Sequence, residues 1–111
     1  MFRADRSEEG RICLLGLEGS LSSSDLVNLS ERLRGLAARG VLRVVVDLRA
    51  VRYASAQALG VLVTFLVELR RRGGDLALLG CPGHLRELFA LCGLDEIFQF
   101  LEPPEDGSQD G

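Results

Sequence analysis

Residues 44–74, VVVDLRAVRYASAQALGVLVTFLVELRRRGG, give the clearest structural signal in the chain. The run 44–48 is short and β-branched, which predicts a buried strand with Asp47 at its end. A long apolar pattern begins near Ser55 and ends at the cationic run 70–72, where positive charge suits the negative end of a helix. Two glycines follow and stop that helix. The stretch therefore predicts one buried strand followed by one long helix.

The residues before this stretch predict a hairpin and another helix. Phe2–Arg6 is predicted to form an edge strand, and the polar run 7–10 is typical of a turn. The continuous apolar run 12–17 predicts a strand covered on both faces, which Gly19 and Ser20 stop. A helix follows, because serines that can cap it precede leucines at helical intervals. Its cap has the capping-box spacing Ser22-x-x-Asp25, and its end is expected near Gly40.

The residues after the stretch predict two strands and a short helix. The run 75–80 reads as another buried strand, and Pro82 and Gly83 open a helix that Gly93 closes. Residues 97–101 are the last strand candidate. The order is then β-β-α-β-α-β-α-β, which predicts a single α/β domain over residues 1–101 with a mixed sheet and three main helices. Residues 102–111 are acidic with no apolar side chain to bury, so we expect a disordered tail.

The composition excludes several classes of function. The chain has 111 residues and a net charge of −3, and all 13 of its basic residues are arginine. The absence of lysine removes a P-loop lysine and a Schiff-base lysine. His84 is the only histidine, so multi-histidine metal sites cannot form within one chain. Aromatic residues make up 5% with no tryptophan, too few for a nucleic-acid stacking surface. We expect no enzymatic activity, cofactor, metal or nucleic-acid partner.

The cysteines and the apolar runs indicate the cellular compartment of the protein. Cys13, Cys81 and Cys92 lie in apolar runs without a C-x-x-C pair, which predicts three reduced core thiols. No signal-like apolar stretch follows the charged N-terminus, and the longest apolar run, 58–69, is too short to cross a bilayer. We therefore expect a cytoplasmic protein.

Five short motifs occur in a fixed order along the chain. They are GSLS at 19–22, VVDL at 45–48, YASAQALGVL at 53–62, GGDL at 73–76 and L-x-x-LF-x-x-x-GL at 85–94. In this order and spacing the sequence resembles the STAS domain family, the sulfate-transporter and anti-sigma-factor-antagonist domains. It resembles most the free-standing bacterial anti-anti-sigma factors, in which the first and third motifs read G-E-L-D and F-I-D-S-S-G-L-G-V-L.

The resemblance also defines where this chain departs from the family. It implies that a kinase-type anti-sigma factor phosphorylates the first serine of D-S-S-G and that this phosphorylation prevents its binding to the antagonist. That position is Ala56 here, which has no hydroxyl to accept phosphate. Gln57 and Ala58 replace the second serine and the glycine, while Ser55 and Ser22 replace the two acidic residues. The resemblance therefore transfers the fold and a partner surface, and leaves no modified residue at position 56.

The serines near the two predicted helix starts admit two interpretations. Ser55 is favoured as an N-cap whose hydroxyl satisfies a backbone N–H, a role typically worth about 1 kcal/mol. The alternative is a displaced phosphorylation site, because a phosphate there would meet the positive end of the helix. Ser22, Ser23 and Ser24 carry the same two interpretations.

The helix after Ser55 has a mostly polar face suited to a protein partner. On a helical projection Gln57, Gly60, Val61 and Thr64 gather opposite the leucines, with Gly60 leaving a notch and Val61 an exposed apolar contact. The residues alone favour the alternative, an ordinary solvated helix face. The resemblance favours partner binding, because it implies that this helix and the loop before it form the partner surface. The predicted partner-binding residues are Ser22, Ser23, Ser55, Ala56, Gln57, Gly60, Val61 and Thr64.

The sequence favours two functions over a third, a small-ligand sensor that would use the loops around Ser22 and Ser55 and has little direct support. The first is a non-enzymatic regulator that binds an anti-sigma factor of the serine-kinase type without being switched at the usual serine. The second is a scaffold or accessory STAS subunit of a stressosome-like or transporter complex. A homodimer is compatible with both, and direct membrane insertion is expected in neither.

Overall fold

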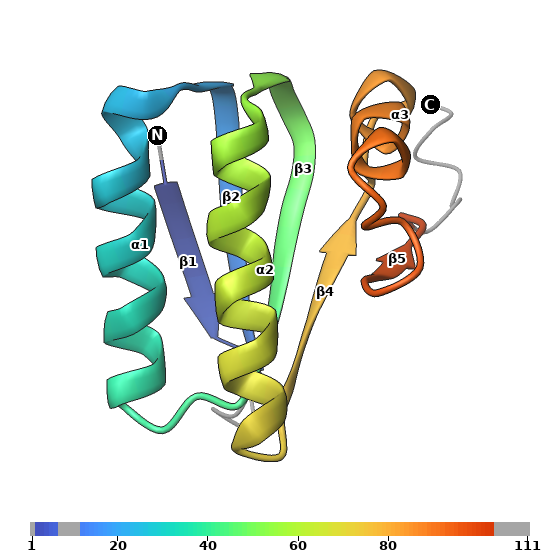
Figure 1. The fold of residues 1–111 in the computed structure, drawn as a ribbon. Helices are drawn as coiled ribbons and strands as arrows, with labels where there is room; N and C mark the ends of the chain where they lie inside the picture. The colour runs from blue at the N-terminus through green and yellow to red at the C-terminus, as the bar shows by residue number, and fades with distance from the viewer. Residues whose placement is uncertain (1, 7–11, 104–111) are drawn as a thin grey trace.

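The computed structural model describes residues 2–6 and 12–103 (Figure 1). In chain order its elements are β1 (Phe2–Arg6), β2 (Ile12–Leu21), α1 (Ser23–Ala38), β3 (Arg43–Ala54), α2 (Ala56–Arg71), β4 (Asp75–Leu79), α3 (Gly83–Leu91) and β5 (Gln99–Leu101). The predicted order of strands and helices is confirmed. The predicted turn at 7–10 and the predicted tail beyond Pro103 lie outside the described residues.

The strands form one mixed sheet whose spatial order, β1-β2-β3-β4-β5, is also the chain order. β1 pairs with β2 in the antiparallel sense, and β2, β3, β4 and β5 are parallel neighbours. Each parallel pair is joined by a helix, as crossover connections require. The predicted mixed sheet is therefore confirmed, with α1 and α2 side by side over one of its faces (Figure 1).

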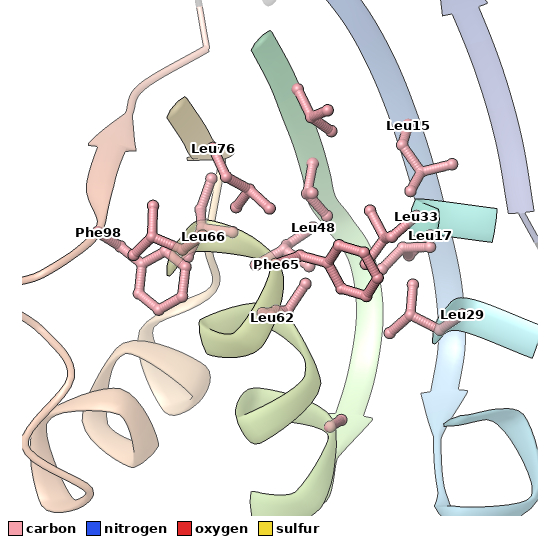
Figure 2. Close-up of a cluster of buried hydrophobic side chains, with 14 of the residues drawn as sticks. Leu15, Leu17, Leu29, Leu33, Leu48, Leu62, Phe65, Leu66, Leu76 and Phe98 are labelled. Atoms are coloured by element: carbon pink, nitrogen blue, oxygen red, sulfur yellow. The ribbon is translucent and has the colours of Figure 1, made fainter. Parts of the chain in front are cut away.

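The hydrophobic core lies between this face of the sheet and the helices. Strand residues such as Leu15 and Leu76 are fully buried, and they face helix residues such as Leu29 and Leu66 (Figure 2). In β2 every second residue from Cys13 to Leu17 is buried, which is the period of a strand with one face on the core. The prediction that the run 12–17 is covered on both faces is therefore wrong. None of the helices in the described part of the chain is both long and apolar enough to cross a membrane.

The predicted ends of the strands in β2 and β3 are wrong. β2 continues past Gly19 and Ser20 to Leu21, and β3 continues past Leu48 to Ala54. The two strands stay paired because the register shifts between Gly19 and Ser20, where the Gly19 backbone takes a φ of 79°. Glycine adopts this conformation without the penalty of a Cβ atom. The extra residue of the bulge, Arg52, lies opposite in β3, so the pairing continues past Gly19.

Asp47 consequently lies in the middle of β3 rather than at its end. Its carboxylate accepts hydrogen bonds from the backbone N–H of Arg49 at 3.0 Å and from its guanidinium Nε at 3.0 Å and Nη2 at 2.8 Å. The hydrogen bonds and the charge of Asp47 raise the pKa of Arg49. The aspartate is thereby stabilised as an anion in a nearly buried position.

The last strand is shorter than predicted. β5 begins at Gln99, while Ile97 and Phe98 belong to the turn before it, where the Ile97 N–H donates to the Leu94 carbonyl at 3.2 Å. Phe98 is nevertheless buried, because its ring meets that of Phe89 edge-on with centroids 5.4 Å apart. An apolar run thus marks burial here more reliably than it marks strand.

The prediction of three core thiols is wrong for Cys92. Cys13 is buried and Cys81 half-buried, but Cys92 caps the solvent-facing end of α3 and is exposed. None of these three cysteines forms a disulfide bond in the described part of the chain. Burial raises the pKa of Cys81 to about 11, although the nearby Arg86 charge opposes the shift. Cys81 is therefore a thiol rather than a thiolate at neutral pH.

Candidate functional site

The starts of α1 and α2 lie next to each other at one edge of the sheet. β2 and β3 are parallel and end in register, with Leu21 opposite Ala54. The Ser55 N–H donates to the Leu21 carbonyl at 3.1 Å, so the two connections are joined directly. Both helices begin at this edge (top of Figure 1). Two positive helix ends therefore converge on one small surface.

A capping box closes the start of α1, as its spacing predicts. The Asp25 carboxylate accepts from the Ser22 N–H at 3.1 Å and from the Ser22 hydroxyl at 3.3 Å. The hydroxyls of Ser22 and Ser24 are 3.1 Å apart. Ser23 is the first residue of α1, and its side chain lies outside the described part of the structure. The Asp25 charge partly satisfies the positive end of this helix.

Ser55 caps α2 in the predicted way. Its hydroxyl oxygen accepts from the Ala58 N–H at 3.2 Å. Ala56 and Gln57 follow in the first turn and are exposed. Position 56 thus presents a methyl group to solvent at a positive helix end. The structure brings Ser22, Ser55, Ala56 and Gln57 together at this edge.

The outer face of α2 continues from this edge, but Val61 does not belong to it as predicted. Gln57, Gly60 and Thr64 are exposed, and the Thr64 hydroxyl donates to the Gly60 carbonyl at 3.0 Å. Val61 is half-buried and lines a groove between α1 and α2. A helical projection separates core from surface, but it does not show which flank a neighbouring helix covers. Val61 is therefore less exposed than predicted, and its contact with a partner stays a prediction.

An apolar shelf that sequence reasoning missed lies beside the same edge. Tyr53 at the end of β3 is 54% exposed and Leu91 at the end of α3 is 84% exposed. They line a shallow depression of about 250 Å³ with Leu88 and His84. The His84 Nε2 lies 2.8 Å from the Arg52 carbonyl oxygen, which ties α3 to β3. Tyr53 directly precedes the motif that contains Ser55, and this proximity is the sequence signal that could have identified it.

The described residues contain no cluster of three or more His, Cys, Asp or Glu side chains able to hold a metal ion. The nearest carboxylate to the edge on α1, Asp25, is engaged by Ser22. The surface at this edge consists of two helix starts, serine hydroxyls and small side chains, and the apolar shelf lies beside it. Such a surface suits recognition of another macromolecule.

Comparison with known proteins gives a consistent result. The family model described as "Mlab, STAS domain" matches residues 4–102. A protein of Bordetella bronchiseptica named "Putative anti-sigma factor antagonist BtrV" is 33% identical over 82 residues, which cover 74% of this chain and 71% of that protein.

Two solved structures of SpoIIAA are similar in fold. The anti-sigma factor antagonist SpoIIAA in its unphosphorylated form superposes with a TM-score of 0.82 at 15% identity, covering 99% of this chain and 94% of that one. The phosphorylated form, described as a Bacillus cell fate determinant, gives 0.75 at 16% identity, covering 99% and 97%.

Proposed function

The chain belongs to the STAS domain family, and from this premise we propose that it is a non-enzymatic regulator that binds an anti-sigma factor. The anti-sigma factor antagonist name of the Bordetella relative supports this partner class. The adjoining starts of α1 and α2, with the outer face of α2, supply the partner surface. We extend the proposal to an anti-sigma factor of the serine-kinase type.

The methyl group of Ala56 is the observation that carries the rest of the proposal. SpoIIAA is known in unphosphorylated and phosphorylated forms, so that protein is modified. Ala56 offers no oxygen at the aligned position, and the Ser55 hydroxyl next to it already serves α2 as a cap. The complex would therefore be controlled by abundance rather than by phosphate on this chain.

A second candidate is a scaffold subunit that holds two partners at once. The apolar shelf of Tyr53 and Leu91 favours it, because this shelf is an exposed surface separate from the mostly polar outer face of α2. A scaffold of a stressosome-like or transporter complex needs two such surfaces. Binding of an anti-sigma factor alone needs only one.

The kinase-type partner should form a complex that ATP does not dissociate. We expect the intact mass of the chain to stay unchanged after incubation with the anti-sigma factor kinase of the same bacterium and ATP, since position 56 has no acceptor oxygen. Ala56→Ser is the first comparison, and Ser22→Asp with Ser55→Asp and Ala56→Ser is the second, because aspartate still caps helices. One phosphate on the unsubstituted chain at Ser55, or within 22–24, would contradict the proposal.

The partner surface can be tested with a matched pair of glycines. Gly60 on α2 and Gly35 on α1 are both exposed, and a side chain at either meets no atom within 4 Å. Gly60→Arg is expected to weaken binding of the anti-sigma factor about tenfold or more, since it places a bulky charge within the contact surface. Gly35→Arg is the control and should bind as the unsubstituted chain does. Equal affinities of the two variants in calorimetry would move the interface away from α2.

A further inference from the structure

A groove of about 400 Å³ runs between α1 and α2, on the side of the helices away from the sheet edge that carries Ser55. Its floor is apolar, formed by Ala37 and Ala38 of α1 and by Val61 and Phe65 of α2. From Val61 to Glu68 the groove follows two turns of α2, a length of about 10 Å at the rise of an α-helix. Its volume is within the range of small-molecule sites, roughly 300–1,000 Å³.

The charges on the rim of the groove leave one cation without a counter-ion. Glu68 is ion-paired with Arg72 at 3.0 Å and with Arg71 at 3.7 Å. Arg72 also donates to the Ala37 carbonyl at 3.0 Å. Arg34, in contrast, donates only to the neutral Ser30 hydroxyl at 3.4 Å, and it has no ion pair among the described residues. The groove therefore combines an elongated apolar floor with an unneutralised guanidinium.

We infer that this groove binds a straight-chain carboxylate of medium length, with its carboxylate on Arg34 and its alkyl chain along Phe65 and Val61. A planar guanidinium matches a carboxylate with two parallel N–H donors. The floor has no free polar side chain that would have to be desolvated, because the Thr64 hydroxyl at its margin already donates to the Gly60 carbonyl. An elongated trench fits one alkyl chain better than a compact or branched ligand.

Binding can be measured on the isolated chain, so it does not depend on the proposed regulatory function. Hexanoate, octanoate and decanoate are the probes, titrated by calorimetry below their micellar concentrations. Each buried methylene should tighten binding about fourfold, which is the hydrophobic gain expected per CH₂. Heptyltrimethylammonium has the same seven-carbon alkyl chain as octanoate with the opposite charge, and it should bind at least tenfold more weakly than octanoate.

Two substitutions locate the site within the groove. Arg34→Gln should weaken octanoate binding about tenfold or more, while Arg32→Gln, an exposed arginine of α1 outside the groove, should leave it unchanged. Thr64→Phe should abolish binding, because the added ring would fill the groove. Position 64 is exposed on α2, so the larger side chain should not prevent folding. Equal affinity for hexanoate and decanoate, or equal loss in the Arg34 and Arg32 variants, would overturn the inference and indicate unspecific adsorption.

Discussion

Replacing Gly74 by alanine is expected to lower the free energy of unfolding by about 3 kcal/mol, the upper end of the usual cost of overpacking. Gly74 connects α2 to β4, and its N–H donates to the Leu69 carbonyl at 2.7 Å. A Cβ atom at this position would overlap the Leu42 carbonyl oxygen and lie 2.7 Å from the carbonyl carbon. These are backbone atoms, so no side-chain rotation can make room.

The Leu42 carbonyl is also held in place by a hydrogen bond. It accepts from the Asp75 N–H at 2.9 Å, which starts the pairing of β3 with β4. An alanine at position 74 would therefore have to break this bond or displace the start of a central strand.

Gly60→Ala is the matched control for that substitution. Gly60 is inside α2, and a Cβ atom there meets nothing within 4 Å. Alanine should stabilise the chain by about 0.5–1 kcal/mol, the difference in helix propensity between the two residues. Urea denaturation of both variants measures the contrast. A Gly74→Ala protein as stable as the unsubstituted chain would show that the close approach to Leu42 is not maintained in solution.

Phe89→Ala is expected to cost about 3–5 kcal/mol of unfolding free energy, as for other buried aromatic side chains. Phe89 is 1% exposed at the centre of the contact between α3 and the C-terminal strand. Its ring meets Phe98 at 5.4 Å and Phe100 at 5.6 Å, both edge-on. Each such pair adds about 0.5–1.5 kcal/mol beyond the burial of area. The substitution removes both pairs and leaves a cavity.

Leu91→Ala, in the same helix, is the control. It shows how much of the loss of stability comes from buried packing rather than from replacing a helical residue by alanine. Leu91 is 84% exposed, so its truncation should change the unfolding free energy by less than about 0.5 kcal/mol. Chemical denaturation followed by circular dichroism compares the two variants. Similar losses at positions 89 and 91 would mean that the Phe89 cluster does not hold α3 to the sheet.

The sequence predicts the helices of this chain better than the strand ends. Ser22 and Ser55 cap α1 and α2 as their residue types predict, because capping is a local interaction between near neighbours. The extension of β2 to Leu21 could not be predicted, since it depends on a partner strand more than thirty residues away. A glycine considered alone indicates the end of a strand, whereas Gly19 stays paired with β3, which accommodates the register shift with an extra residue, Arg52.

In the candidate site, too, local features could be predicted from the sequence, whereas features that depend on distant elements could not. Position 56 and its serine and glutamine neighbours could be located from the motif alone. The contact between Ser55 and Leu21, and the half-burial of Val61 in the groove, arise from the packing of elements that are distant in sequence. The apolar shelf was missed because Tyr53 and Leu91 come from different elements and neither is unusual in its own segment.

The identity of spatial and chain order in the sheet has a consequence for how the protein is made. Each strand pairs with the strand that precedes it in the chain, so no strand synthesised early has to wait for one synthesised late. The entropic cost of loop closure is then divided into small steps, one for each hairpin or strand-helix-strand unit. Folding is therefore slowed less than it would be by pairing between strands distant in the chain. During translation the sheet can grow from β1 towards β5 as the chain leaves the ribosome, and its exposed growing edge is always the one that the next strand will cover.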